Sequence, residues 1–250
     1  MRQAFVQGAS RGLGLAITEA LLRRGDFARV FATARAPEPS RGLAALARKY
    51  GDALAYWPLD VCDEASIAKA ASRTGEATER LHLVVNAAGV LHDDTLGLEP
   101  EKRLEHLKPE SLRHAYDVNA IGPLLVARHL LPLLQHDERS VLANVSARVG
   151  SIEDDRLGGW YAYRGSKAAQ NLFTKNLSIE LGRRAPECIC VALHPGTVDT
   201  ELSRPFQSSV PPGKLFTPRD AAARLLDVIE SLGPEDSGAF LAYDGARIPW

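Results

Sequence analysis

The feature that most constrains the fold is a glycine-rich turn near the start of the chain. Gly8, Gly12 and Gly14 follow the run 2–7, which we predict to be a strand, and apolar residues then recur at helical spacing over 13–24. Glycines let the backbone approach a phosphate group, and the first N–H groups and the dipole of a helix attract its charge. This order predicts a phosphate-binding turn, although a glycine loop alone can be only a tight turn.

The rest of the chain alternates regularly between predicted strands and helices. Further strands are expected at 29–33, 53–58, 81–86, 140–145, 188–193 and 239–243. No repeat, low-complexity run or Pro/Gly linker divides the chain. We therefore predict one α/β domain over residues 1–250, a Rossmann-type doubly wound parallel β-sheet with helices on both faces.

Right-handed crossovers place the loops that leave the strands on one edge of such a sheet. Five residues from separate regions fall at these strand ends, namely Gly8, Asp60, Asn86, Ser146 and Pro195. An open α/β sheet binds its ligand at this edge, so we expect the functional site there.

Composition excludes several other classes of protein. Thirty basic and 31 acidic side chains leave a net charge of −1, which indicates no nucleic-acid or anionic-membrane partner. No apolar run approaches the roughly 18 residues of a membrane span, and the first strand starts at Arg2, so we expect a cytoplasmic protein.

Cys188 and Cys190 are expected on one face of a strand as buried thiols. With Cys62 they form no ligand pairs of suitable spacing, so no metal is expected.

Tyr163 and Lys167 are the strongest candidates for chemistry. At i and i+4 on a helix they share one face, with Cβ atoms roughly 5–6 Å apart. A nearby ammonium favours the phenolate, so we expect the Tyr163 pKa to lie below its usual value of about 10. Reduction of a carbonyl requires such a proton donor near neutral pH. The pair alone also occurs on many solvated helices.

Five motifs, in order, resemble those of the short-chain dehydrogenase/reductase family. They are the glycine turn, Asn86-Ala87-Ala88-Gly89, Asn119, the Tyr163/Lys167 pair and Pro195-Gly196. Residues 158–164 and 243–250 are similar to the C-factor/sniffer-type carbonyl reductase branch. The resemblance implies an oxidoreductase that transfers hydride between a nicotinamide cofactor and a small-molecule carbonyl or alcohol.

The resemblance also implies catalytic roles. Tyr163 is the expected general acid/base, and Lys167 is expected to hold the nicotinamide ribose and stabilise the tyrosinate. Asn119, in a helix expected at 111–134, is expected to position a water that relays a proton to Lys167, or to bond helix backbone, or both. Tyr161 has Gly165 instead of lysine at i+4, and we expect it to line the pocket or to pack.

The serine that normally holds the substrate oxygen is the main departure from the family. The run Asn144-Val145-Ser146-Ala147 puts Ala147 in that position. We favour Ser146, one residue earlier, as the fourth catalytic residue, with Ser151 or no serine as alternatives. Loop 152–159 is longer than usual and is expected to cover part of the pocket. Gln7 stands where the family commonly has threonine.

The second strand favours NADP(H) over NAD(H). NAD enzymes usually place an acidic residue at its end, whereas this chain has Ala34 followed by Arg35. Arg35 can bind a 2′-phosphate with Arg11 adding charge, or both can be solvated. Asp60 is also a candidate N-cap. The expected cofactor-binding residues are Gly8, Ser10, Arg11, Gly12, Leu13, Gly14, Arg35, Asp60, Val61, Asn86, Ala87, Gly89, Tyr163, Lys167, Pro195, Gly196, Val198 and Thr200.

Residues 201–216 resemble the variable lid of the family, with Leu202, Phe206 and Leu215 as its expected apolar anchors. Thr217 and Pro218 are expected to cap and open the last helix. Pairing through helices 111–134 and 163–181 into a homodimer or homotetramer is open.

Two other functions are weighed against a reductase. An NADP(H)-binding sensor or signalling protein with little turnover is favoured by the missing serine, and is opposed by the intact Asn119, Tyr163 and Lys167. An epimerase or dehydratase is disfavoured, because it needs a longer C-terminal substrate domain than the stretch after Gly196.

Overall fold

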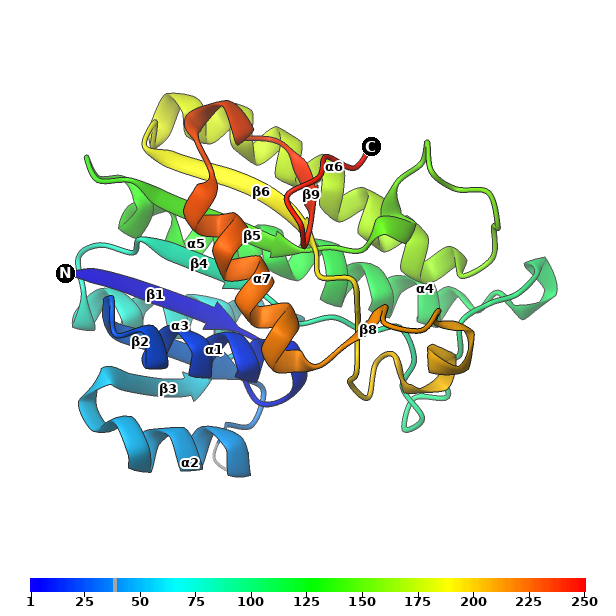
Figure 1. The fold of residues 1–250 in the computed structure, drawn as a ribbon, viewed down its shortest axis with the longest axis horizontal. Coiled ribbons are helices and arrows are strands. Elements are labelled where there is room, and N and C mark those ends of the chain that lie inside the picture. The colour runs from blue at the N-terminus through cyan, green and yellow to red at the C-terminus, as the bar shows by residue number, and fades with distance from the viewer. Residues whose placement is uncertain (38–39) are drawn as a thin grey trace.

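The computed structural model describes residues 1–37 and 40–250, and a parallel sheet runs through its centre (Figure 1). The seven strands lie in the order β3-β2-β1-β4-β5-β6-β9. Their bounds are β1 Arg2–Gln7, β2 Phe27–Ala34, β3 Leu54–Pro58, β4 Leu83–Asn86, β5 Ser140–Val145, β6 Cys188–His194 and β9 Phe240–Ala242. All neighbouring pairs are parallel, so the strand C-termini share one edge. The chain changes direction across the sheet between β1 and β4, where such sheets bind ligands.

Helices cover both faces of the sheet. Their bounds are α1 Gly12–Arg24, α2 Arg41–Tyr50, α3 Glu64–Ala77, α4 Pro109–Tyr116, α5 Gly122–Leu134, α6 Tyr161–Arg184 and α7 Pro218–Ser231. Short 3-10 turns lie at Gly51–Ala53, Leu104–His106, Arg148–Gly150, Arg204–Ser209 and Pro234–Asp236. In Figure 1, α1 and α7 lie in front of the sheet, and α5 and α6 lie behind it. The predicted doubly wound sheet is confirmed.

The strands are apolar on both sides because each face carries its own core. Along β1, Val6 packs in the core under α1, α2 and α7, whereas Phe5 packs in the core under α3, α5 and α6. Val85 and Val84 alternate in the same way along β4. A parallel sheet covered on both faces requires such near-continuous apolar strands. Cys188 and Cys190 are buried in one core, as predicted.

The structure departs from the expected elements in three places. The helix expected at 111–134 is interrupted by a π-helical turn, Asp117–Ile121, between α4 and α5. Two short parallel strands, β7 Thr197–Val198 and β8 Leu215–Phe216, were not expected. The prediction of Asp60 as an N-cap is wrong, because Asp63 directly precedes α3 and accepts from the Ala65 N–H at 2.9 Å.

Two negative findings apply to residues 1–37 and 40–250. Within them, every helix is too short or too polar to cross a membrane. The same residues bring no three His, Cys, Asp or Glu side chains together in a way that would hold a metal ion.

Candidate active site

The glycine turn is built from main-chain atoms. The N–H groups of Gly8 and Ala9 both donate to the Thr33 carbonyl, at 2.9 and 2.8 Å. Gly8 has φ 84°, and a Cβ there would lie 2.6 Å from Ala88 N, so no other residue fits without movement. The N-cap residue Arg11 makes no side-chain capping bond, and the first turn of α1 has no acidic residue. The positive pole of α1 is therefore available to an anion, as a dinucleotide pyrophosphate requires.

Polar side chains join the first and fourth strands beneath this turn. Gln7 is buried, and its Oε1 accepts from the Ala88 N–H at 3.1 Å, so it ties β1 to the loop after β4. Asn86 is fully buried, and its Nδ2 donates to Asn144 Oδ1 at 2.8 Å. Asn144 in turn donates to Thr174 Oγ1 at 2.9 Å. The Asn86 amide Nδ2 thus bonds within the interior, whereas its buried Oδ1 has no hydrogen-bond partner among the described residues.

Residues from distant segments meet at the sheet edge. A Cβ at Gly89 would lie 3.4 Å from Asn119 Oδ1, 3.8 Å from Lys167 Nζ and 3.9 Å from the Leu202 side chain. A Cβ at Gly12 would likewise lie 3.2 Å from the Thr200 side chain. Five expected site residues therefore meet along one rim, where the glycines let neighbouring side chains come close to the backbone.

Other expected cofactor residues surround that rim. Arg35 is exposed directly after β2, and Arg11 forms an exposed ion pair with Glu201 at 2.5 Å. Val61 is buried and packs against Gly122 at the start of α5. Ser10 accepts at its carbonyl from Ser40 Oγ at 2.8 Å. Leu13 is part of α1, Val198 of β7, and Pro195 and Gly196 form the turn between β6 and β7.

Lys167 is almost fully buried, at 3% exposure, on the face of α6 that also carries Tyr163. Its Nζ donates to the Val145 carbonyl at 2.8 Å and to Gln170 Oε1 at 3.0 Å. The same nitrogen lies 6.0 Å from the centre of the Tyr163 ring. The end of β5 and the side chain of Gln170 therefore hold the ammonium beside the tyrosine.

Burial, not the ammonium, dominates the electrostatics of this pair. It raises the pKa of Tyr163 to about 12 and lowers the pKa of Lys167 to about 7. The prediction of a lowered Tyr163 pKa is therefore wrong. Desolvation accounts for both shifts, and the ammonium does not offset it at the phenol.

Asn119 links three segments from the centre of the π-helical turn. Its Oδ1 accepts from the Val90 N–H at 2.8 Å, and its Nδ2 donates to the Val90 carbonyl at 2.8 Å and to Ser166 Oγ at 3.0 Å. It is fully buried. The expectation that it bonds helix backbone is wrong, because its backbone partner is the loop after β4.

Both candidate serines are buried and donate within the protein. Ser146 Oγ donates to Asn171 Oδ1 at 2.6 Å, and Ser151 Oγ donates to the Trp250 carbonyl at 3.3 Å. Ala147 occupies the position between β5 and the short turn that follows. The role of Ser146 stays a prediction.

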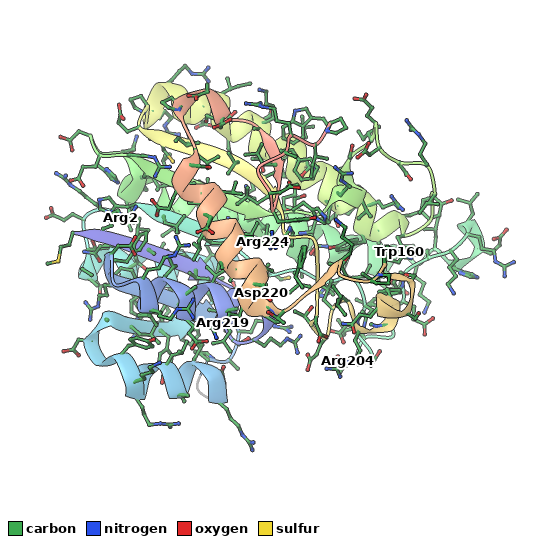
Figure 2. The ribbon with its side chains drawn as sticks, viewed as in Figure 1. Arg2, Trp160, Arg204, Arg219, Asp220 and Arg224 are labelled. Carbon is green, nitrogen blue, oxygen red and sulfur yellow. The ribbon has the colours of Figure 1, made fainter. Side chains whose placement is uncertain are left out.

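An aromatic wall lies next to Tyr163. The Trp160 ring centre is 6.4 Å from that of Tyr163 and 4.7 Å from that of Phe206 in the lid segment. Figure 2 shows Trp160 and Arg204 at the lid end of the molecule, far from Arg2. The wall brings an apolar surface to the catalytic pair.

One expectation for the surroundings of this wall is wrong. Leu215 is 38% exposed, and Phe216 is the apolar anchor instead, 4.7 Å edge-on to Tyr243. The apolar side chains of loop 152–159, Ile152 and Leu157, are 78% and 90% exposed, and the expectation that this loop covers part of the pocket stays a prediction. Tyr161 is 40% exposed and does not pack in the core.

Several residues around the pair were not identified from the sequence. Gln170 and Asn171 lie three and four positions after Lys167 on α6, and helical spacing was a signal that could have found them. Glu101, whose Oε2 accepts from the Ala162 N–H at 3.2 Å, gave no local signal, because its loop meets α6 only in the folded chain.

The family model described as short chain dehydrogenase matches residues 2–210. The chain belongs to the short-chain dehydrogenase/reductase family. Over their full lengths, it is 32% identical to a 1-hydroxy-2-glutathionyl-2-methyl-3-butene dehydrogenase of Rhodococcus sp.. It is also 37% identical to the C-signal protein of Myxococcus xanthus, over 56% of this chain and 78% of that protein.

Solved structures agree with this assignment. An NADPH-bound carbonyl reductase from chicken fatty liver superposes with a TM-score of 0.87, at 32% identity over 100% of this chain and 99% of the other. The carbonyl reductase Sniffer of D. melanogaster gives 0.88 at 28% identity, covering all of both chains. The expected fold and C-factor/sniffer-like branch are confirmed, and the chain is a family oxidoreductase.

Proposed function

We propose that the protein is an NADP(H)-dependent carbonyl reductase in which Tyr163 is the general acid. The observation that carries this proposal is the meeting of Tyr163, Lys167, Asn119 and Gly89 beside a main-chain phosphate turn, at the edge where the sheet order reverses. Relatives described as carbonyl reductases support the reaction class, and one of them was solved with NADPH.

The residues present fit a bound nicotinamide dinucleotide. The N–H groups at the start of α1 are placed to bind the pyrophosphate, and exposed Arg35 after β2 to bind a 2′-phosphate. Arg35 follows alanine rather than an acidic residue, which favours NADP(H) over NAD(H). When bound, the cofactor supplies the hydride.

Tyr163 donates the proton to the carbonyl oxygen. With a pKa of about 12, its phenol keeps the proton at neutral pH, so it is in the form that a carbonyl oxygen needs when it gains hydride at carbon. Lys167 Nζ lies where it can bind the nicotinamide ribose, and Asn119 completes the proton path to it through water.

The aromatic wall suggests which carbonyls enter. The Trp160 ring lies edge-on to the Tyr163 ring and packs against Phe206, and the segment 201–216 acts as the lid. A small molecule with apolar groups beside its carbonyl buries them against these rings.

A specific observation supports a second candidate, an NADP(H)-binding sensor with little turnover. Ala147 has no hydroxyl for the substrate oxygen, and the Ser146 hydroxyl donates its hydrogen bond to Asn171 Oδ1. Without a donor at this point, charge developing on the oxygen gains less stabilisation. The similarity to the C-signal protein is compatible with this candidate.

The deciding experiment follows NADPH absorbance with purified protein and a panel of aldehydes, ketones and diketones. We expect oxidation of NADPH with at least one carbonyl, and its near-complete loss in Tyr163→Phe. NADPH binding is measured in parallel from cofactor fluorescence. Binding without turnover of any carbonyl would overturn the reductase and favour the sensor, and absence of binding would overturn both.

A further inference from the structure

The helix that carries Tyr163 and Lys167 begins without a cap of its own. Trp160 is the N-cap residue of α6, it makes no side-chain capping bond, and no acidic residue lies in the first turn. Trp160 also has φ 51°, the one positive φ outside glycine among residues 1–37 and 40–250. This is a strained conformation for a bulky residue, which persists only where neighbours hold it.

Glu101, in the loop between β4 and α4, supplies the missing support. Its carbonyl accepts from the Trp160 N–H at 2.5 Å, and its Oε2 accepts from the Ala162 N–H at 3.2 Å. Ala162 directly precedes Tyr163. Gly159 lets this loop come close, because a Cβ there would lie only 3.2 Å from the Glu101 carbonyl oxygen. Glu101 thus binds the main-chain N–H groups of both Trp160 and Ala162 at the start of α6.

The Glu101 side chain is buried, so its contact with α6 is part of the protein interior and not of the surface. The side chain is 2% exposed, and burying a carboxylate is unfavourable unless charge or hydrogen bonds compensate. Compensation comes from the positive pole of α6 and the Ala162 N–H. Its Oε1 has no partner, and Glu101 lines, with Tyr163 and Ser111, a cavity of about 10 Å³, the size of one water.

The sequence at the start of α6 explains why the cap comes from elsewhere. A serine or aspartate at position 160 would cap the helix locally, but that position holds the indole that packs 4.7 Å from Phe206. The aromatic wall therefore takes the N-cap position, and the capping group comes from another loop.

We propose that Glu101 is a positioning residue for Tyr163. By capping α6 from the neighbouring loop, it holds the phenol in register with Lys167 and Asn119, although it touches no reacting atom. The kinetic part of this inference rests on the proposed reductase function.

Two substitutions separate positioning from general stability. Glu101→Ala removes the side-chain acceptor, and we expect kcat to fall about 10- to 100-fold because small displacements of a catalytic group cost that much. The KM for NADPH should change less than about twofold, since the phosphate turn is untouched. Glu101→Gln keeps an acceptor for the Ala162 N–H and should restore most of kcat. Glu105→Ala, at an exposed acid of the same loop, is the matched control.

Amide hydrogen exchange at residues 161–163 tests the capping step without any turnover. We expect about tenfold faster exchange there in Glu101→Ala, wild-type protection in Glu105→Ala, and partial protection in Glu101→Gln. Unchanged exchange in Glu101→Ala overturns the proposal, as does faster exchange with unchanged kcat. If the wild type reduces no carbonyl, the proposed function fails, and the exchange data alone decide whether Glu101 holds α6.

Discussion

The phosphate turn and the start of α6 lie on the same edge of the sheet but are built in different ways. The turn uses main-chain atoms, with Gly8 and Ala9 bonded to Thr33 and the start of α1 left without a side-chain cap. The start of α6 uses side chains from other segments, with Asn119 bonded to Val90 and Ser166. A local sequence pattern can describe the first kind of site but not the second, and the two should fail differently when mutated.

The largest effect should come from Tyr163→Phe, in the region built from side chains. Removal of the hydroxyl takes away the proton donor, so we expect kcat for carbonyl reduction to fall about 1,000-fold. The fold should be unchanged and NADPH should still bind, because the phosphate turn does not depend on this side chain. Steady-state NADPH oxidation measures kcat, circular dichroism measures the fold, and fluorescence titration measures NADPH binding.

Tyr161→Phe is the matched control for that substitution. Tyr161 lies on the same helix but is 40% exposed, so kcat should stay within about twofold of the wild type. An equal loss in both variants would show that the hydroxyl of Tyr163 has no special role.

The second effect tests the region built from main-chain atoms. Gly8→Ala puts a methyl group 2.6 Å from Ala88 N at a φ of 84°, so we expect a loss of about 3 kcal/mol in the free energy of unfolding. NADPH binding should weaken as well, because the turn must shift.

Gly182→Ala is the control: it lies in α6 with no atom within 4 Å of the new Cβ, and it should stabilise the protein by about 0.5 kcal/mol. Urea unfolding of both variants measures the difference, and similar values would contradict the close packing of Gly8.

The same contrast explains how much the sequence could predict. The strands of the sheet were located to within two residues, because apolar runs between turn residues are local patterns. The glycine motif correctly placed the turn, since φ and close approach are properties of single residues. The π-helical turn at Asn119 and the cap from Glu101 could not be predicted, because both depend on contacts between segments far apart in the chain. The pKa of Tyr163 was misjudged for the same reason, since burial is set by the whole fold.

Arg35→Ala tests the side chain that we expect to bind the 2′-phosphate of NADP(H). A charged hydrogen bond to a 2′-phosphate contributes about 2 kcal/mol, so NADPH should bind about 30-fold more weakly, whereas NADH binding should hardly change. Arg48→Ala, an exposed arginine in the last turn of α2, is the control. Fluorescence titration with both cofactors checks the result, and equal weakening of NADH and NADPH would contradict 2′-phosphate recognition.

The last effect concerns the buried amine and is seen as a slope with pH. Lys167 has a folded-state pKa of about 7, lowered by burial, whereas the unfolded chain holds its proton to a pH of about 10. Between these values the unfolded state binds more protons, so stability due to Lys167 rises with pH, by up to about 1.4 kcal/mol per pH unit. Lys167→Met should flatten the pH dependence of the free energy of unfolding over this window, whereas Lys175→Met, exposed on the same helix, serves as the control. Urea unfolding from pH 7 to 9 measures the slopes. Parallel slopes for wild type and Lys167→Met would mean that the ammonium keeps its charge in the folded protein. A charged Lys167 would lower the pKa of Tyr163, as the i, i+4 spacing of the two residues predicts.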